Sequence, residues 1–110
     1  MTRQDLQTIA FALPAVTHVV QWGASDVYKV GGKVFAICGE GVSFKVSEIG
    51  FLALTESGRG RQAPYCAKGQ WVNVGLADLA SDDLRDWLTN SHALVAAKLT
   101  RKLRTELGLS

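Results

Sequence analysis

The sequence is poor in the residues that build metal and redox centres. It contains two cysteines, Cys38 and Cys66, and two histidines, His18 and His92, and it has no Cys-x-x-Cys motif. The histidines lie on different predicted elements, so a catalytic triad or a metal site would have to be assembled by tertiary contacts. We therefore expect free thiols, structural histidines, no metal, no cofactor and no enzymatic activity.

The chain also lacks a long hydrophobic run. No stretch approaches the roughly 18 apolar residues that a membrane span requires, and the polar residues 1–5 lack the apolar segment of a signal peptide. We therefore expect a cytoplasmic protein. With 110 residues, 47% of them hydrophobic and 20% charged, the sequence fits one globular domain over residues 1–110.

Net charge is low, but the charges are unevenly placed. Twelve basic and ten acidic residues give a formal net charge of +2. Residues 57–77 contain no acidic residue but include Arg59, Arg61 and Lys68, and four aspartates follow between residues 78 and 86. This distribution predicts a molecule with two electrically different sides, one of which could attract an anionic partner.

The first half of the chain predicts a helix followed by a meander of strands. Apolar residues recur at helical spacing before Pro14, which ends the helix. Gly31-Gly32 separates two β-prone stretches, and both glycines can take the positive φ angles that a two-residue hairpin requires. The expected elements are a helix with the buried positions Leu6, Ile9, Ala10 and Leu13, and strands at residues 17–21, 26–30, 33–38 and 42–46.

Two further helices are expected, one on each side of a strand that starts at Trp71. Ser47 should cap the first and Ser81 the second, because serine hydroxyls accept hydrogen bonds from free amides at helix starts. The charged end after Leu99 either continues the second helix or forms a new helix that Thr100 caps. The expected buried stripes are Ile49, Leu52 and Ala53 in the first helix, and Leu84, Trp87, Leu88, Ser91, Val95 and Leu99 in the second. This order of elements predicts an α+β fold in which an antiparallel sheet has helices on one side.

The strand at Trp71 carries apolar residues at alternate positions. Val72 and Val74 should face the core, so Trp71 and Asn73 should face the opposite side of the sheet. A tryptophan on this polar face is either covered by a helix or loop, or it serves as a platform for a ligand. We expect Trp71 to be partly exposed beside Tyr65, at the mouth of a shallow groove lined by Lys45 and Lys68.

Six short motifs occur in order along nearly the whole chain. They are Leu13-Pro14, Trp22-Gly23, residues 28–36, Ala63-Pro-Tyr65, residues 68–72 and residues 94–99. Together they resemble the MmcQ/YjbR-like family of small bacterial proteins, although members often carry proline where this chain has Thr100. The resemblance implies a two-layer α+β fold related to frataxin (CyaY) and to secretion chaperones. In this fold a twisted antiparallel sheet has the N- and C-terminal helices packed on one face.

The resemblance also implies DNA binding, because members of this family are described as DNA-binding proteins with a double-wing arrangement. The modest net charge predicts weak, salt-sensitive and electrostatic binding, since phosphate contacts supply most of the affinity for nucleic acid. The candidate nucleic-acid-binding residues are Lys29, Lys33, Lys45, Arg59, Arg61, Tyr65, Lys68, Trp71 and Asn73. The alternative is a protein-interaction module, monomeric or weakly dimeric, that uses Tyr65 and Trp71 as anchors.

Overall fold

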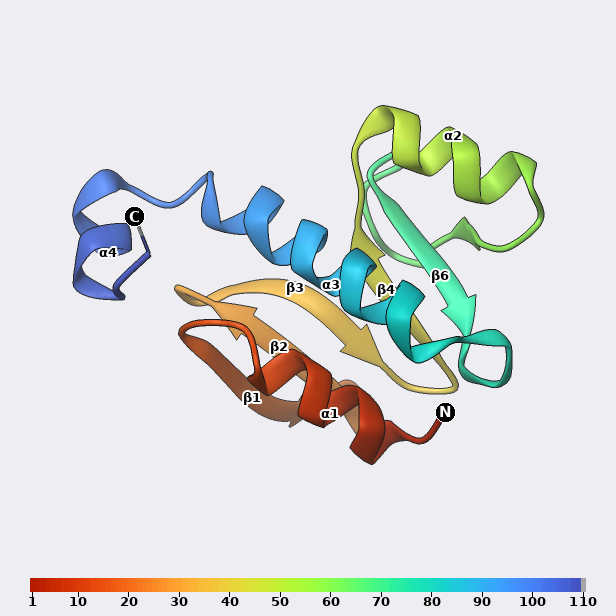
Figure 1. Ribbon diagram of the computed structural model, residues 1–110, viewed down its shortest axis with the longest axis horizontal. Coiled ribbons are helices and arrows are strands. Elements are labelled where there is room, and N and C mark those ends of the chain that lie inside the picture. The colour runs from red at the N-terminus through yellow and green to blue at the C-terminus, as the bar shows by residue number, and fades with distance from the viewer. Residues whose placement is uncertain (110) are drawn as a thin grey trace.

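The computed structural model describes residues 1–109 (Figure 1). Its elements, in chain order, are α1 (Arg3–Phe11), β1 (Val16–Gln21), β2 (Ser25–Val30), β3 (Lys33–Cys38), β4 (Gly41–Lys45), α2 (Glu48–Glu56), β5 (Arg61–Gln62), β6 (Trp71–Gly75), the short 3-10 helix η1 (Leu76–Asp78), α3 (Ser81–Ala96) and α4 (Arg101–Glu106). Within residues 1–109 the strands form one six-stranded sheet in the order β1-β2-β3-β4-β6-β5, and every neighbouring pair is antiparallel.

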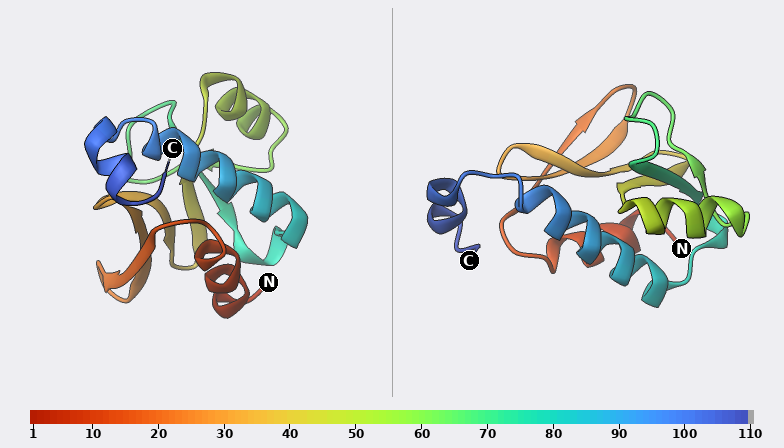
Figure 2. Two further views of the ribbon diagram at one scale, coloured as in Figure 1. Left: turned by 60° about the vertical axis from the view of Figure 1, so that its left-hand side comes forward. Right: turned by 90° about the horizontal axis from the view of Figure 1, so that it is seen from above.

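The sheet and its helices form two layers. Helix α3 packs across β2, β3 and β4, α1 packs against α3 and β1, and α2 packs against β5 and β6. Figure 2 shows α1 and α3 on the same side of the sheet, whereas the opposite side carries only turns and loops in the described part of the chain. The predicted α+β fold, with the N- and C-terminal helices on one face, is therefore confirmed. The uncovered side is called the open face below.

The hairpin between β2 and β3 is the one that the sequence predicts. Gly31 and Gly32 have φ angles of +59° and +80°, and Val30 pairs with Lys33 across the two-residue turn. Positive φ at both central positions matches the twist of the flanking strands. The helix expected before Pro14 is also confirmed, because Leu6, Ile9 and Ala10 are buried on α1.

A serine of α3 joins two strands where their pairing is interrupted. Tyr28 pairs with Ala36 but the next residue, Lys29, pairs with Val34, so Phe35 lies in a bulge of β3. The Ser91 hydroxyl donates a hydrogen bond to the Phe35 carbonyl oxygen at 2.7 Å and accepts one from the Lys45 backbone amide at 2.9 Å. Ser91 thus satisfies two backbone groups that the β3–β4 ladder leaves unpaired.

The buried stripe expected for α2 is wrong. Ile49 is 81% exposed and Leu52 is 53% exposed, Ala53 is also exposed, and Leu54 is the residue that α2 buries. Residues 51–54 are all apolar, so several stripes fit helical spacing and the sequence cannot select among them. The contact of α2 with β5 and β6 selects Leu54, and it leaves apolar side chains in solvent.

The ends of the last two helices differ in part from the prediction. Ser81 is the first residue of α3 and does not cap it, because Ala80 occupies the capping position. Thr100 does cap a separate helix α4, since its hydroxyl accepts a hydrogen bond from the Leu103 amide at 3.1 Å. Of the two alternatives for the C-terminal segment, a new helix is therefore correct.

Candidate functional site

One row of side chains crosses the whole open face. Strand pairing places its members side by side, and they alternate with the buried residues that face α3. In sheet order the row consists of Val19, Val27, Ile37, Ser43, Asn73 and Arg61. The half on β1, β2 and β3 is apolar, and the half on β4, β6 and β5 is polar. Val27 and Ser43 are buried, so the row offers apolar contact at Val19 and Ile37, and hydrogen-bonding groups at Asn73 and Arg61, to a molecule lying across the sheet.

A groove of about 660 Å³ lies over the central and polar part of this row. We call it the open-face groove. The amide of Asn73 donates a hydrogen bond to the Ser43 hydroxyl at 3.0 Å on its floor. Arg61, which is exposed, lies beside them and forms no ion pair with the residues that the structure describes. The groove is lined by Trp22, Ser25, Ile37, Gly39, Glu40, Gly41, Ser43, Arg61, Pro64, Tyr65, Cys66 and Asn73.

Two exposed aromatic side chains flank the groove from opposite ends of the sheet. Trp22, in the turn between β1 and β2, is 64% exposed, and Tyr65, in the loop between β5 and β6, is fully exposed. Figure 2 shows this turn and this loop rising from the open face, away from α1 and α3. The two residues thus form a pair of aromatic projections on separate loops.

Both aromatic residues have a left-handed backbone, which is unfavourable for bulky side chains. The φ angle is +48° at Trp22 and +62° at Tyr65, and this conformation costs on the order of 1–2 kcal/mol per residue. The Cys66 amide bonds the Ala63 carbonyl at 3.4 Å, so Tyr65 holds the third position of a turn in which Pro64 is second. Glycine is the usual residue there. Stability therefore gives no reason for tyrosine at this position.

The side chain of Gln62 holds the loop that carries Tyr65. Its amide nitrogen donates to the carbonyl oxygens of Ala63 at 2.9 Å and Cys66 at 3.2 Å. Its amide oxygen accepts from the Gly69 backbone amide at 2.9 Å. One side chain thus ties both ends of the loop, which fixes the position of Tyr65 despite its exposure. Sequence analysis missed Gln62, because nothing in the sequence shows which carbonyl groups surround it.

The predicted nucleic-acid-binding residues divide between the open face and other places. Lys29, Lys45, Arg61, Trp71 and Asn73 occupy open-face positions of β2, β4, β5 and β6. Trp71 is partly exposed, as expected, and is the cross-strand neighbour of Lys45. Lys33 is exposed beside the β2–β3 hairpin, and Lys68 is exposed in the β5–β6 loop.

The expected placement of the groove is wrong. Tyr65 does line a groove, but among the described residues its other walls come from Trp22 and Arg61 and not from Lys45, Lys68 or Trp71. The strand pairing explains this, because Lys45 and Trp71 pair at the far end of β4 and β6 from Gly41 and Gly75. From the sequence, Trp22 is noted only as part of the Trp22-Gly23 motif.

Arg59 does not contribute its charge to the open face. Its guanidinium forms an ion pair with Asp83 of α3 at 2.6 Å and lies 5.0 Å from the centre of the Trp87 ring. Arg59 lines a smaller hollow of about 360 Å³ that adjoins the open-face groove through Arg61 and Asn73. The Asp83 carboxylate therefore offsets the charge of Arg59, and the role of Arg59 in binding nucleic acid stays a prediction.

The local charges on and near the open face partly oppose one another. Glu40, in the β3–β4 turn, lines the open-face groove together with Arg61. Burial lowers the pKa of Lys45, and repulsion from Lys98 and Lys33 lowers it further. Lys33, Lys45 and Lys98 are thus close enough for their positive charges to repel one another. An anion bound between them would relieve this repulsion.

A histidine and a carboxylate meet on the helix-covered face, where strand pairing brings β1 and β2 together. His18 Nε2 lies 2.8 Å from Asp26 Oδ1, and Arg3 Nε donates to Asp26 Oδ2 at 2.9 Å. Burial of Asp26 opposes its ionisation, but the hydrogen bonds from His18 and Arg3 prevail and lower its pKa. Burial raises the pKa of the nearby Cys38 thiol, which disfavours the reactive thiolate. This cluster fastens α1 to the sheet.

The described part of the chain has neither a cluster of metal ligands nor a helix suited to cross a membrane. No three His, Cys, Asp or Glu side chains lie together there as ligands for a metal ion. None of the helices there is long and apolar enough to cross a membrane.

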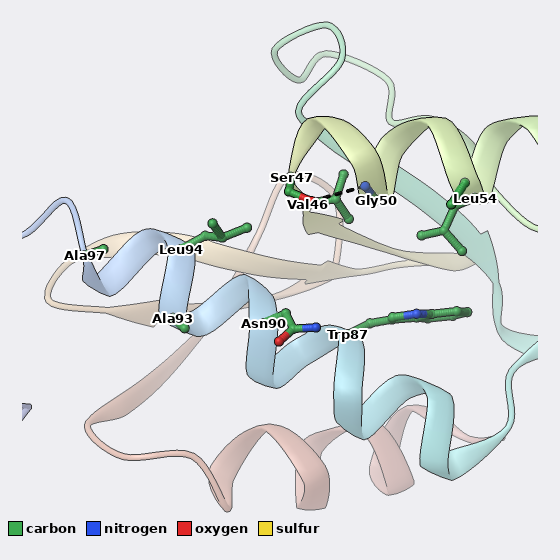
Figure 3. Close-up of a pocket in the computed structure, with 10 residues that line it drawn as sticks. Val46, Ser47, Gly50, Leu54, Trp87, Asn90, Ala93, Leu94 and Ala97 are labelled. Atoms are coloured by element: carbon green, nitrogen blue, oxygen red, sulfur yellow. Dashed lines mark hydrogen bonds between the residues drawn. The ribbon is translucent and has the colours of Figure 1, made fainter.

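A third hollow, of about 590 Å³, lies between α2 and α3 (Figure 3). Its walls are mostly apolar and include Leu54 of α2 and Trp87 of α3, with Ser47 and Asn90 as polar members. The Trp87 ring stacks on Phe44 with centroids 5.4 Å apart. Ile49 and Leu52 lie in solvent on α2. Ile49 is one helical turn from Ala53, which lines the hollow, so this exposed side chain lies near its edge.

The comparisons with known proteins agree on the fold. The YjbR family model matches residues 11–94. A crystal structure of the Deinococcus radiodurans protein DR2400, which carries a DUF419 domain, superposes with a TM-score of 0.88 at 24% sequence identity. The match covers 99% of this chain and 89% of that one. None of the curated proteins matches this chain.

Proposed function

Because this chain belongs to the YjbR family, we propose that it binds nucleic acid on the open face of its sheet, without catalysing a reaction on it. The observation that supports this best is the open-face groove, which is lined by the guanidinium-bearing Arg61, without an ion pair among the described residues, and by the exposed residues Trp22 and Tyr65. In this proposal the two loops that carry these rings correspond to the two wings of the double-wing arrangement. Lys29 and Lys45 add positive charge to the same face.

The proposed binding is weak and does not depend on base sequence. Phosphate contacts provide most of the affinity of a nucleic-acid-binding surface, and Glu40 offsets part of the positive charge in this groove. No helix of the described chain projects from the open face into a position to enter a major groove. Binding should therefore follow salt concentration more closely than sequence.

Arg61 should account for about one phosphate contact. The logarithm of the affinity is expected to fall linearly with the logarithm of salt concentration, with about two to five contacts in total. Arg61→Ala should reduce the slope by about 0.9 for a duplex or about 0.7 for a single strand. Fluorescence anisotropy of labelled oligonucleotides over a salt series measures both slopes.

Arg59→Ala is the matched control, because Arg59 lies two residues away but its guanidinium is already paired with Asp83. This variant should keep the parent salt slope and change stability by no more than about 1 kcal/mol. An equal loss of slope in both variants would contradict the assignment to the open face. Affinity that ignores salt would contradict nucleic-acid binding as proposed.

A second candidate function is protein interaction through the hollow between α2 and α3, with a second copy of this chain as the partner. The supporting observation is that the protruding apolar side chain of Ile49 lies one helical turn from Ala53, at the edge of a mostly apolar hollow. A twofold interface needs this kind of self-complementary patch, in which each copy offers both projection and recess. This places the interaction on another surface than Tyr65 and Trp71.

Sedimentation equilibrium tests this second candidate. The protein should form a concentration-dependent dimer, and Ile49→Lys should suppress it while changing stability by no more than about 0.5 kcal/mol, because Ile49 is 81% exposed. Val20→Lys is the control, since Val20 is 57% exposed but lies on the edge strand β1. A monomer at all concentrations, or a dimer that only Val20→Lys disrupts, would reject this surface.

A further inference from the structure

The open-face groove has the size of a site for a small, flat group. Its volume of about 660 Å³ falls within the roughly 300–1,000 Å³ of pockets that enclose small molecules. Its floor changes from apolar at Ile37 to hydrogen-bonding at Ser43 and Asn73. A nucleotide presents the same combination, with an apolar base face, polar base edges and a charged phosphate.

The two flanking rings point to unpaired bases. In a duplex each base is already stacked on its neighbours, so an aromatic side chain reaches a base face only by separating two base pairs, at a cost of about a few kcal/mol per step. A single strand offers its base faces without this cost. Trp22 and Tyr65 belong to loops at opposite ends of the strand order, and each would therefore contact a different nucleotide. Both residues have strained φ angles, +48° and +62°, and both side chains are exposed, so neither ring contributes much to folding.

The charges of the groove favour binding through base stacking over binding through phosphate contacts alone. Arg61 and Glu40 both line it, so the charges within the groove nearly cancel. A duplex held by phosphate contacts alone would gain little from such a site. A single strand gains stacking on each ring in addition to one phosphate contact at Arg61.

From these observations we propose that the open-face groove selects an unpaired strand of DNA or RNA and stacks one base on Trp22 and another on Tyr65. The inference rests on the proposed nucleic-acid binding and narrows its substrate class. The strand crosses the sheet along the row of Ile37, Ser43 and Asn73, with a phosphate at Arg61.

Glycine substitutions separate the role of the rings from folding. Trp22→Gly and Tyr65→Gly each remove a ring and place at a left-handed position the residue that tolerates it best. The melting temperature should stay the same or rise, while affinity for a thymidine oligomer of about 12 nucleotides falls roughly 5- to 100-fold in each variant. Tyr65→Phe keeps the ring and should bind like the parent.

Binding is measured by fluorescence anisotropy with three probes, which are a thymidine oligomer, a uridine oligomer of equal length and a DNA duplex. Tighter binding of both single strands than of the duplex supports the proposal, and any preference between them identifies DNA or RNA as the better ligand. Glu40→Gln should strengthen binding of the single strands, because it removes the negative charge beside Arg61.

The experiment distinguishes failure of the single-strand inference from failure of the proposed nucleic-acid binding. Duplex affinity equal to or above that of the single strands, with both glycine variants binding like the parent, overturns the inference but leaves the proposed function standing. Failure of all three probes to bind at low salt overturns both. A loss of affinity that Tyr65→Phe shares with Tyr65→Gly also overturns the inference, because the hydroxyl and not the ring would then be required.

Discussion

Gly31→Val is expected to destabilise the protein by about 2 to 5 kcal/mol. The φ angle of Gly31 is +59°, a conformation that costs a residue with a side chain about 1–2 kcal/mol. A Cβ atom at this position would lie 2.6 Å from Cδ1 of Leu99, and Leu99 is itself buried. Crowding a packed site typically costs a further 1–3 kcal/mol, roughly.

Gly32→Val is the matched control for Gly31→Val. Gly32 has a φ angle of +80°, but nothing lies within 4 Å of a Cβ atom built there. It should therefore show the backbone cost alone, about 1–2 kcal/mol. Urea unfolding of both variants gives the difference, which isolates the contact with Leu99. Equal stability of Gly31→Val and the parent would contradict the hairpin register.

Ser91→Ala is expected to cost about 2 to 4 kcal/mol, more than deletion of a surface hydroxyl. The substitution leaves the Phe35 carbonyl and the Lys45 amide without their partner, and each unsatisfied buried group costs about 1–3 kcal/mol. Ser91 is fully buried, so water cannot replace the hydroxyl without opening the packing of α3 against the sheet.

Thr89→Ala serves as the control for Ser91→Ala. The Thr89 hydroxyl donates to the Arg85 carbonyl on the exposed side of the same helix at 2.7 Å. Its loss should change the free energy of unfolding by no more than about 0.5 kcal/mol. Similar small effects in both variants would show that Ser91 does not bridge β3 and β4.

The parts of the fold that the sequence predicts are those specified by local chemistry. Two adjacent glycines predict the hairpin because few other residues accept positive φ at both positions. The alternation of Val72 and Val74 predicts which side of β6 is buried, and both are indeed in the core. Thr100 was recognised as a potential cap, but only the structure shows that a new helix begins after it.

The parts that the sequence could not predict depend on partners distant in the chain. Arg59 lies in a basic stretch that suggests anion binding, yet its guanidinium is paired with the carboxylate of Asp83, which lies 24 residues away in the sequence. Ile49 fits a buried stripe, but the position of α2 over β5 and β6 turns it to solvent.

The candidate site divides in the same way. Arg61, Tyr65 and Asn73 were named from the sequence, because a basic loop and an alternating strand are local patterns. Trp22 was not named as a site residue, because it lines the groove only when the β1–β2 turn and the β5–β6 loop are brought together in the folded structure. Ser43, Asn73 and Arg61 become neighbours only through the pairing of β4, β6 and β5, which are separate strands in the sequence.

Mapping the contact surface by NMR tests the central claim most directly. Backbone amide shifts of the labelled protein are followed while a thymidine oligomer is added. The account predicts that the perturbed amides cluster at residues 21–25 and 61–69 and at Ser43 and Asn73 on the open face, with α2 and α3 unaffected. Perturbations confined to α2 and α3, or none at saturating oligomer, would contradict it.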